Sequence, residues 1–340
     1  MYCLNPYLTY TLQVLAGVLV DHMLHVASLP NPQLSVVSGL LPHLRVLTKA
    51  YPRQTAEHFT RKLVLMHKNL KRGLNRGAAE NDAKTWPGLP ELVFLRILGT
   101  LWPTSDMRHV VVSPARLLMG SYLGLCKIRS FVDAASGLFL CTLFLQYENH
   151  SKRFVPETIN FLIDVIRCLS LPRRGASTRS PLSRRHEFVQ LCIINTGGAR
   201  TMPVNQPHLV TVISGKESGV QTNVDFLGLA VDLLARFSEI YKALDGFVEL
   251  YEPVLQTLHD IDVDFLNPIF QVRIQSISVC APALNSIQGP NISNYRLHPE
   301  TLRVFASESP ASKPSSTQTN PNPIVQSKIR ELLLELSPCA

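Results

Sequence analysis

The sequence has few charged residues and no closely spaced cysteines. Charged residues are 17% of the 340, compared with about 25% in an average soluble domain. Apolar residues are 46%, enough for a sizeable core, which excludes a chain that is disordered throughout. No two of the seven cysteines lie closer than 15 residues, which excludes a Cys-x-x-Cys zinc or redox pair and a small disulfide-stabilised domain. We therefore expect reduced, buried thiols in a cytosolic or nuclear protein.

Signatures of membrane insertion and of catalysis are also missing. The uncharged stretch Met1–Val20 lacks the basic n-region of a signal sequence, and polar residues such as Asn5 and Gln13 dilute its apolar character,. Ala134–Tyr147 is 14 residues long, short of the roughly 20 that span a bilayer. Neither a glycine-rich phosphate loop nor a nucleophile elbow nor a His-Glu-x-x-His motif occurs,. The sequence predicts a non-enzymatic protein with no metal, no cofactor, no membrane partner and no small-molecule substrate. An enzyme is the alternative, and it would need a polar constellation in a pocket.

Prolines divide the first half of the chain into segments with helical periodicity. Ser113-Pro114 pairs a hydroxyl N-cap with a proline at the first helical position, and Val155-Pro156-Glu157 places a carboxylate in a first turn,. Apolar residues between the breaks recur at helical spacing, with few β-alternations. The pattern predicts helices over 8–28, 33–50, 53–73, 89–102, 114–128, 131–149, 156–170, 223–243, 246–260 and 324–337.

The helical segment 131–149 is apolar almost all round, so other helices must cover it on several sides,. Antiparallel helices joined by short turns predict an all-α fold, an irregular α-solenoid or helical-repeat-like array. The stretch 197–219 is expected to be a loop. Five parts are expected: a helical core over 1–170, an Arg/Ser/Pro- and Gly-containing loop region over 171–222, a second helical segment over 223–282, a low-complexity linker over 283–323 and a terminal helix over 324–340.

Basic residues are concentrated before residue 186. The net charge is +8, and Arg61–Arg76 contains six Lys or Arg and no acidic residue. Basic helix faces contact phosphates without reading bases, and Lys152-Arg153 stands before a predicted helix N-terminus, which attracts phosphate. A solvated face that serves only solubility is the alternative. The candidate RNA-binding residues are Arg61, Lys68, Lys71, Arg72, Arg76, Lys152, Arg153, Arg173 and Arg174.

The later helical segment is acidic by contrast. The stretch Asp225–Asp264 contains nine Asp and Glu residues but only one Arg, one Lys and one His. Such a region would repel RNA; it could dock a basic protein or simply offset the basic half. The candidate protein-binding residues are Asp245, Glu249 and Glu252.

Three segments carry a series of ordered matches to a known family: Thr85–Asp106, Arg108–Met119 and Val132–Leu162. They resemble the C-terminal part of the nucleolar protein 14 family, and Phe247–Pro253 is similar to a further family segment downstream. The likeness covers 12–170 well and 223–260 more thinly. The family-like residues include Trp86-Pro87, Leu89-Pro90-Glu91-Leu92, Pro103-Thr104-Ser105-Asp106, Ser136-Gly137-Leu138-Phe139 and Ser151-Lys152-Arg153-Phe154-Val155-Pro156-Glu157.

The resemblance implies a non-enzymatic scaffold and assembly factor of the small-subunit processome, located in the nucleus and nucleolus. Such a factor serves pre-18S ribosomal RNA processing and small ribosomal subunit biogenesis. The implied partners are pre-ribosomal RNA, small nucleolar RNA and other processome proteins, including a nucleolar complex-associated protein and a ribosomal RNA methyltransferase. Family members are much longer, with charged N-terminal regions and a basic C-terminal tail, so a fragment or truncated form is implied. The alternative function is a helical-repeat adaptor or transport receptor that binds proteins without contacting RNA.

Overall fold

The computed structural model describes residues 6–77, 85–106, 108–170, 203–215, 220–244, 246–261 and 267–280. Within these ranges the regular elements are helices, and no strand occurs. The all-α class is therefore confirmed. The helices are α1 (Pro6–Ser28), α2 (Leu34–Ala50), α3 (Pro52–Gly77), α4 (Leu89–Leu101), α5 (Val112–Leu125), α6 (Phe131–Ser151), α7 (Pro156–Leu169), α9 (Leu209–Ile213), α10 (Val220–Tyr241), α11 (Phe247–His259) and α12 (Pro268–Cys280).

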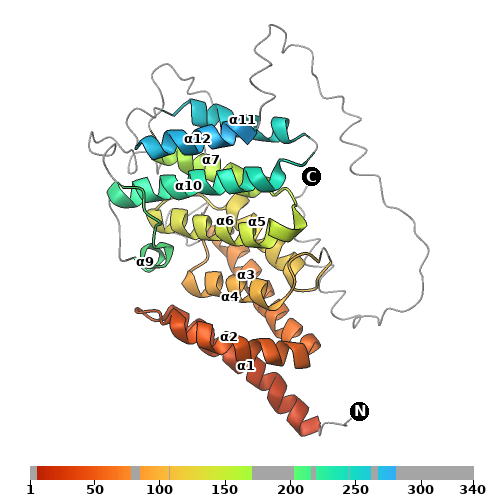
Figure 1. Ribbon diagram of the computed structural model, residues 1–340. Helices are drawn as coiled ribbons and strands as arrows, with labels where there is room; N and C mark the ends of the chain where they lie inside the picture. The colour runs from red at the N-terminus through yellow and green to blue at the C-terminus, as the bar shows by residue number, and fades with distance from the viewer. Residues whose placement is uncertain are drawn as a thin grey trace, which may run out of the picture.

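The helices stack in approximate chain order, from α1 at one end of the molecule to α11 and α12 at the other (Figure 1). Helices two places apart contact each other, as α3 does with α5, α4 with α6, and α5 with α7. Helix α10 then packs against both α6 and α7, and α12 packs against α10. The described helices thus share one hydrophobic core. The finer expectation of a solenoid, and the boundaries of the five parts, stay predictions.

Nine of the ten predicted helices are present, and the tenth, 324–337, lies outside the described residues. Two described helices were not predicted. The short α9 lies inside the stretch expected to be a loop, and its five residues, LVTVI, are too few to show a helical period. Helix α12 has its apolar residues spread around the axis, so no face stands out in the sequence,.

The start of α5 differs from the prediction. The expected cap, Ser113, lies inside the helix, which begins one residue earlier at Val112. The Nδ1 atom of His109 instead accepts the backbone N–H groups of Val111 and Val112, each at 3.2 Å. A helix terminus requires an acceptor for its free N–H groups, and here an imidazole supplies it.

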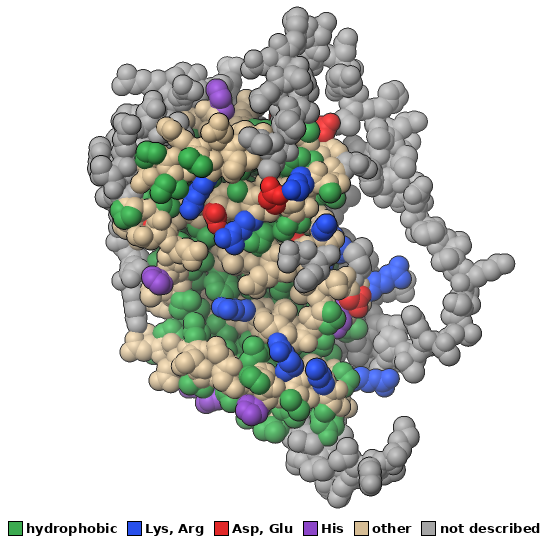
Figure 2. Space-filling model, in the orientation of Figure 1, with side chains coloured by type: hydrophobic (Ala, Val, Ile, Leu, Met, Phe, Trp, Pro, Cys, Tyr) green, Lys and Arg blue, Asp and Glu red, His purple; other side chains and the backbone are tan. Residues whose placement is uncertain are grey.

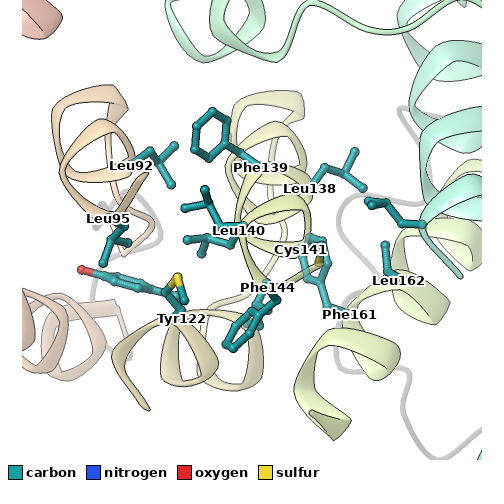
Figure 3. Packing of buried hydrophobic residues seen from close by; sticks show 14 of the residues in the cluster. Leu92, Leu95, Tyr122, Leu138, Phe139, Leu140, Cys141, Phe144, Phe161 and Leu162 are labelled. Atoms are coloured by element: carbon teal, nitrogen blue, oxygen red, sulfur yellow. The ribbon is translucent and has the colours of Figure 1, made fainter. Parts of the chain in front are cut away.

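Helix α6 is the most deeply enclosed helix in the described array, as its apolar sequence predicted. Leu140 and Phe144 are at most 1% exposed, and side chains of α4, α5 and α7 surround them (Figure 3). The thiols of Cys126, Cys141 and Cys168 are buried, as the sequence predicted, and these three cysteines form no disulfide. Among the described residues, no helix is long and apolar enough to cross a bilayer.

Two glycines allow aromatic rings to reach the backbone of a neighbouring helix. A Cβ atom at Gly137 of α6 would overlap the Phe161 ring of α7, and a Cβ at Gly99 of α4 would overlap the Tyr147 ring of α6. The Tyr147 hydroxyl donates a hydrogen bond to the carbonyl oxygen of Leu95 at 2.8 Å. The close packing of α4, α6 and α7 therefore depends on the absence of side chains at these two positions.

We expect Gly137→Ala to destabilise the fold by about 1–3 kcal/mol, because the added methyl group overpacks a filled interface. The matched control is Gly39→Ala in α2, where a Cβ meets nothing within 4 Å. That exchange should stabilise the protein by about 0.5–1 kcal/mol through helix propensity alone. Urea unfolding followed by circular dichroism measures both, and equal effects of the two variants would contradict the packing argument.

Candidate functional site

Helix α3 carries most of the predicted RNA-binding residues, and one side of it is exposed and basic. Lys68, Arg72 and Arg76 stand at i, i+4 and i+8 and are all exposed, so they follow one another in steps of about 6 Å along the helix. We call these three residues the α3 ridge. The opposite side of the helix is buried, and its ring of Phe59 stacks on that of Phe94 with centroids 4.9 Å apart. The stacking fixes the outward direction of the ridge.

The predicted residue Arg61 differs from the ridge because a carboxylate already pairs with it. Its guanidinium lies 2.6 Å from a carboxylate oxygen of Glu57, one turn earlier. The neighbouring Lys62 reaches Asp21 of α1 at 2.5 Å. Most of the unbalanced positive charge of α3 is therefore found in its second half, and Arg53 adds to it in the first turn.

The separation of charge along the sequence becomes a separation in space. Helices α1 to α4 carry ten Lys and Arg against three Asp and Glu, whereas α10 and α11 carry five Asp and Glu against one Arg. On the face shown in Figure 2, Lys and Arg side chains lie over both the upper and the lower part of the molecule, whereas Asp and Glu side chains lie mostly in the upper part. A polyanion is attracted to one end of the array and repelled by the other.

A groove of about 1020 Å³ lies beside α3. Its walls come from α3, from α5 with the loop before it, and from the loop between α6 and α7. Each of these three segments contributes a basic side chain to the edge of the groove: Lys71, Arg108 and Arg153. We call these three residues the groove rim. Among the described residues that line the groove, Glu157 is the one carboxylate.

The groove brings together predicted residues from two separate basic segments, Lys71 and Arg153. Lys152 is exposed but does not line the groove; it ends α6 in the left-handed conformation, with φ of 51°. Arg173 and Arg174 lie outside the described residues. Sequence reasoning missed four groove residues with basic side chains, because no local pattern shows that they will face Lys71: His67, Arg108, His109 and Arg116.

A buried ion pair holds the walls of the groove together. The guanidinium of Arg116 on α5 contacts the carboxylate of Glu148 on α6, and their side chains are 9% and 0% exposed. Arg116 also donates to the carbonyl oxygen of Thr104 at 3.3 Å and to the hydroxyl of Ser151 at 3.2 Å. Glu148 accepts hydrogen bonds from the Ser151 hydroxyl and from the backbone N–H of Arg153, the latter at 3.3 Å. These contacts fix the position of the loop between α6 and α7.

Helix α10 closes the other side of this network. The ring of Phe154 packs edge-on against Tyr241 of α10, with centroids 5.2 Å apart. Burial, and secondarily the nearby Glu148 carboxylate, raise the pKa of Tyr241, so its phenol stays neutral. Burial, with Arg116 adding to it, lowers the pKa of the Arg153 guanidinium, and Glu148 opposes that change.

The predicted protein-binding residues lie on the acidic end of the array. Glu249 and Glu252 are both exposed on α11, one turn apart. Asp245 lies outside the described residues. The structure therefore places two carboxylates on one helix, at the end of the array that does not contain the groove.

Together these features define an all-α helical array with a basic ridge on α3 and a basic, preformed groove between α3, α5 and the loop that joins α6 to α7. The model of the Nop14-like family matches residues 6–284, and the chain belongs to that family, as its resemblance predicted.

Named relatives agree with this assignment. The chain is 37% identical over 269 residues to the nucleolar protein 14 of Homo sapiens, covering 76% of this chain and 30% of that protein. It is 28% identical over 254 residues to the nucleolar protein 14 of Mus musculus, covering 71% of this chain and 28% of that protein. A probable nucleolar complex protein 14 of Schizosaccharomyces pombe is 24% identical over 264 residues, which cover 75% of this chain and 30% of that protein.

The chain thus spans about three-tenths of the length of these relatives. Their names support the predicted localisation in the nucleus and nucleolus.

The buried ion pair makes a prediction about stability. Arg116→Met should cost about 3–5 kcal/mol, because it leaves the Glu148 carboxylate buried without its partner. The double variant Arg116→Met with Glu148→Leu should be more stable than that single variant, since no buried charge remains. Arg61→Met, which breaks an exposed pair, is the control and should change stability by less than about 1 kcal/mol. Urea midpoints test the order; a double variant less stable than Arg116→Met would contradict it.

Because His109 caps α5, the stability of the fold should depend on pH. Burial lowers the pKa of His109 below 6.5, so on acidification the unfolded chain takes up this proton before the folded chain does. The contribution of His109 is therefore fully present above about pH 6.5 and is lost as the pH falls,. His109→Asn keeps a capping oxygen without titrating. Between pH 7.5 and 5, wild type should lose more stability than this variant, as measured by thermal unfolding; parallel curves would refute the assignment.

Proposed function

We propose that the chain is a non-enzymatic scaffold and assembly factor of the small-subunit processome. In this role it serves pre-18S ribosomal RNA processing and small ribosomal subunit biogenesis. Membership of the Nop14-like family supports a role in ribosome biogenesis in the nucleolus, where the names of its relatives place them. The non-enzymatic part of the proposal rests on the lack of catalytic motifs in the sequence,.

The observation that carries the RNA-binding part of the proposal is the α3 ridge. Its three cations lie on one side of a helix, exposed and successive, at the end of the array where Lys and Arg outnumber Asp and Glu. Such a row neutralises backbone phosphates and reads no bases. We propose pre-ribosomal RNA and small nucleolar RNA as the nucleic-acid partners of this surface.

Processome proteins, including a nucleolar complex-associated protein and a ribosomal RNA methyltransferase, are the proposed protein partners. The exposed Glu249 and Glu252 on α11 offer an acidic surface to a basic protein,. The alternative function is an adaptor that binds proteins and no RNA. The aliphatic part of the groove lining favours this alternative, because hydrocarbon surface contributes to protein contacts and not to phosphate contacts,.

The triple variant Lys68→Glu, Arg72→Glu and Arg76→Glu tests the ridge. It should lower the affinity for a transcript of the small-subunit rRNA precursor at least tenfold. It should also reduce the slope of log affinity against log salt concentration by about two to three, because each phosphate contact releases about 0.7–0.9 counterion. The control is Lys49→Glu, Arg53→Glu and Arg96→Glu, which makes the same charge change at exposed positions on α2, α3 and α4. Filter binding over a salt series measures both.

Equal RNA binding by the ridge variant and its control would contradict the ridge assignment. The function itself is tested in cells, where the tagged chain should co-sediment with precursor small-subunit particles. Absence from those particles, with the protein folded by circular dichroism, would favour the adaptor function.

A further inference from the structure

The groove beside α3 combines an aliphatic interior with a basic edge. Leu70 and Leu74 face it from α3, and Leu117 and Leu125 face it from α5. Leu117 is 40% exposed and Leu125 is 60% exposed, so hydrocarbon remains open to solvent. The volume of about 1020 Å³ is at the upper end of the roughly 300–1,000 Å³ typical of small-molecule sites. The groove has room for several side chains of a macromolecular ligand.

The charges around the groove select an acidic ligand. Lys71, Arg108 and Arg153 stand at the three walls, against Glu157. The Glu157 side chain lies along α5, with its Cγ atom 3.4 Å from where a Cβ of Gly124 would be. It is therefore packed against the wall of the groove, and the three cations of the rim dominate the charge that an entering ligand meets.

Three rings that line the groove, those of Phe144, Phe154 and His109, already pack against protein. Phe144 is 1% exposed, Phe154 packs against Tyr241, and His109 lies against Trp102 with ring centroids 5.8 Å apart. Among the described lining residues, these rings already have protein neighbours. Single-stranded nucleic acids bind through stacking on open aromatic faces together with a basic track, so an aliphatic protein ligand fits this surface better than RNA does.

The groove is formed before any ligand arrives. The buried contact between Arg116 and Glu148 joins α5 to α6, and the backbone N–H of Arg153 is bonded to the same carboxylate. A ligand therefore does not have to order the walls, which lowers the entropic cost of binding. Because the walls are helices and a loop, they present no strand edge to an extended peptide, and their aliphatic lining favours the helix-in-groove mode,.

We infer that the groove binds a short amphipathic helix of a partner protein, with aliphatic side chains on one face and Asp or Glu along its flanks. The aliphatic side chains contact Leu74, Leu117 and Leu125, and the carboxylates lie against Lys71 and Arg108. This site is separate from the α3 ridge and does not depend on RNA binding.

A phage-displayed library of random 16-residue peptides, selected on the full chain, tests the inference. Ser121→Trp places an indole in the groove, because Ser121 lines it and its hydroxyl bonds only its own helix, at the carbonyl of Leu117. The matched control is Ser38→Trp, whose serine bonds the carbonyl of Leu34 on α2 in the same way, outside the groove. Circular dichroism checks that both variants fold.

The selected peptides should carry aliphatic residues at helical spacing together with Asp or Glu. Their affinity, measured by fluorescence anisotropy, should fall at least tenfold with Ser121→Trp and with the pair Lys71→Glu and Arg108→Glu, and stay unchanged with Ser38→Trp. The ridge triple variant should lower their affinity less than the pair Lys71→Glu and Arg108→Glu does, because its charges lie outside the groove and salt screens them more. Failure of the proposed RNA contact therefore leaves this result intact.

Two results would overturn the inference. One is a selection whose peptides bind Ser121→Trp and Ser38→Trp equally well, or whose consensus is basic. The other is a loss of affinity for the rRNA-precursor transcript with Ser121→Trp but not with Ser38→Trp, which would make the groove a nucleic-acid site.

Discussion

The buried ion pair between Arg116 and Glu148 is the constraint on which the arrangement around the groove depends. Removing two charges from water is unfavourable unless both are fully hydrogen-bonded, and here the backbone of Thr104, the hydroxyl of Ser151 and the N–H of Arg153 complete the network. The network joins two helices and two loops at one point. Hydrophobic contacts alone would hold these elements together, but they are non-directional and would not fix the loop that carries the groove rim.

Helix α6 links this polar network to the apolar core. Its Gly137 admits the Phe161 ring of α7, and its Tyr147 reaches the backbone of α4 beside Gly99. A helix that is apolar on all sides gains most of its stability from neighbours that approach closely. The charged residue near its C-terminal end, Glu148, is tolerated in the core because Arg116 comes to meet it.

The sequence predicted the helices well because each depends on a local signal, such as the proline that starts α7. It did not predict α12, whose apolar residues show no preferred face, or the capping role of His109, because a residue three positions upstream is not a usual cap. The groove was beyond sequence reasoning for a different reason. Lys71, Arg108 and Arg153 belong to three segments that only the tertiary fold brings together, and no periodicity along one segment reports on the others.

Helix α3 shows how one element can serve two kinds of ligand. Its hydrophobic side is anchored through Phe59, its ridge side presents Lys68, Arg72 and Arg76, and its third side closes the groove with Lys71. The 3.6-residue period sets these sides apart around one axis, so a phosphate backbone on the ridge does not fill the groove. Lys71 lies next to Arg72 in sequence yet faces the groove. The cations of the ridge are therefore close enough to attract an anionic ligand in the groove. Two anionic ligands bound together would each be attracted by the shared cations and would repel one another, and salt would weaken both effects.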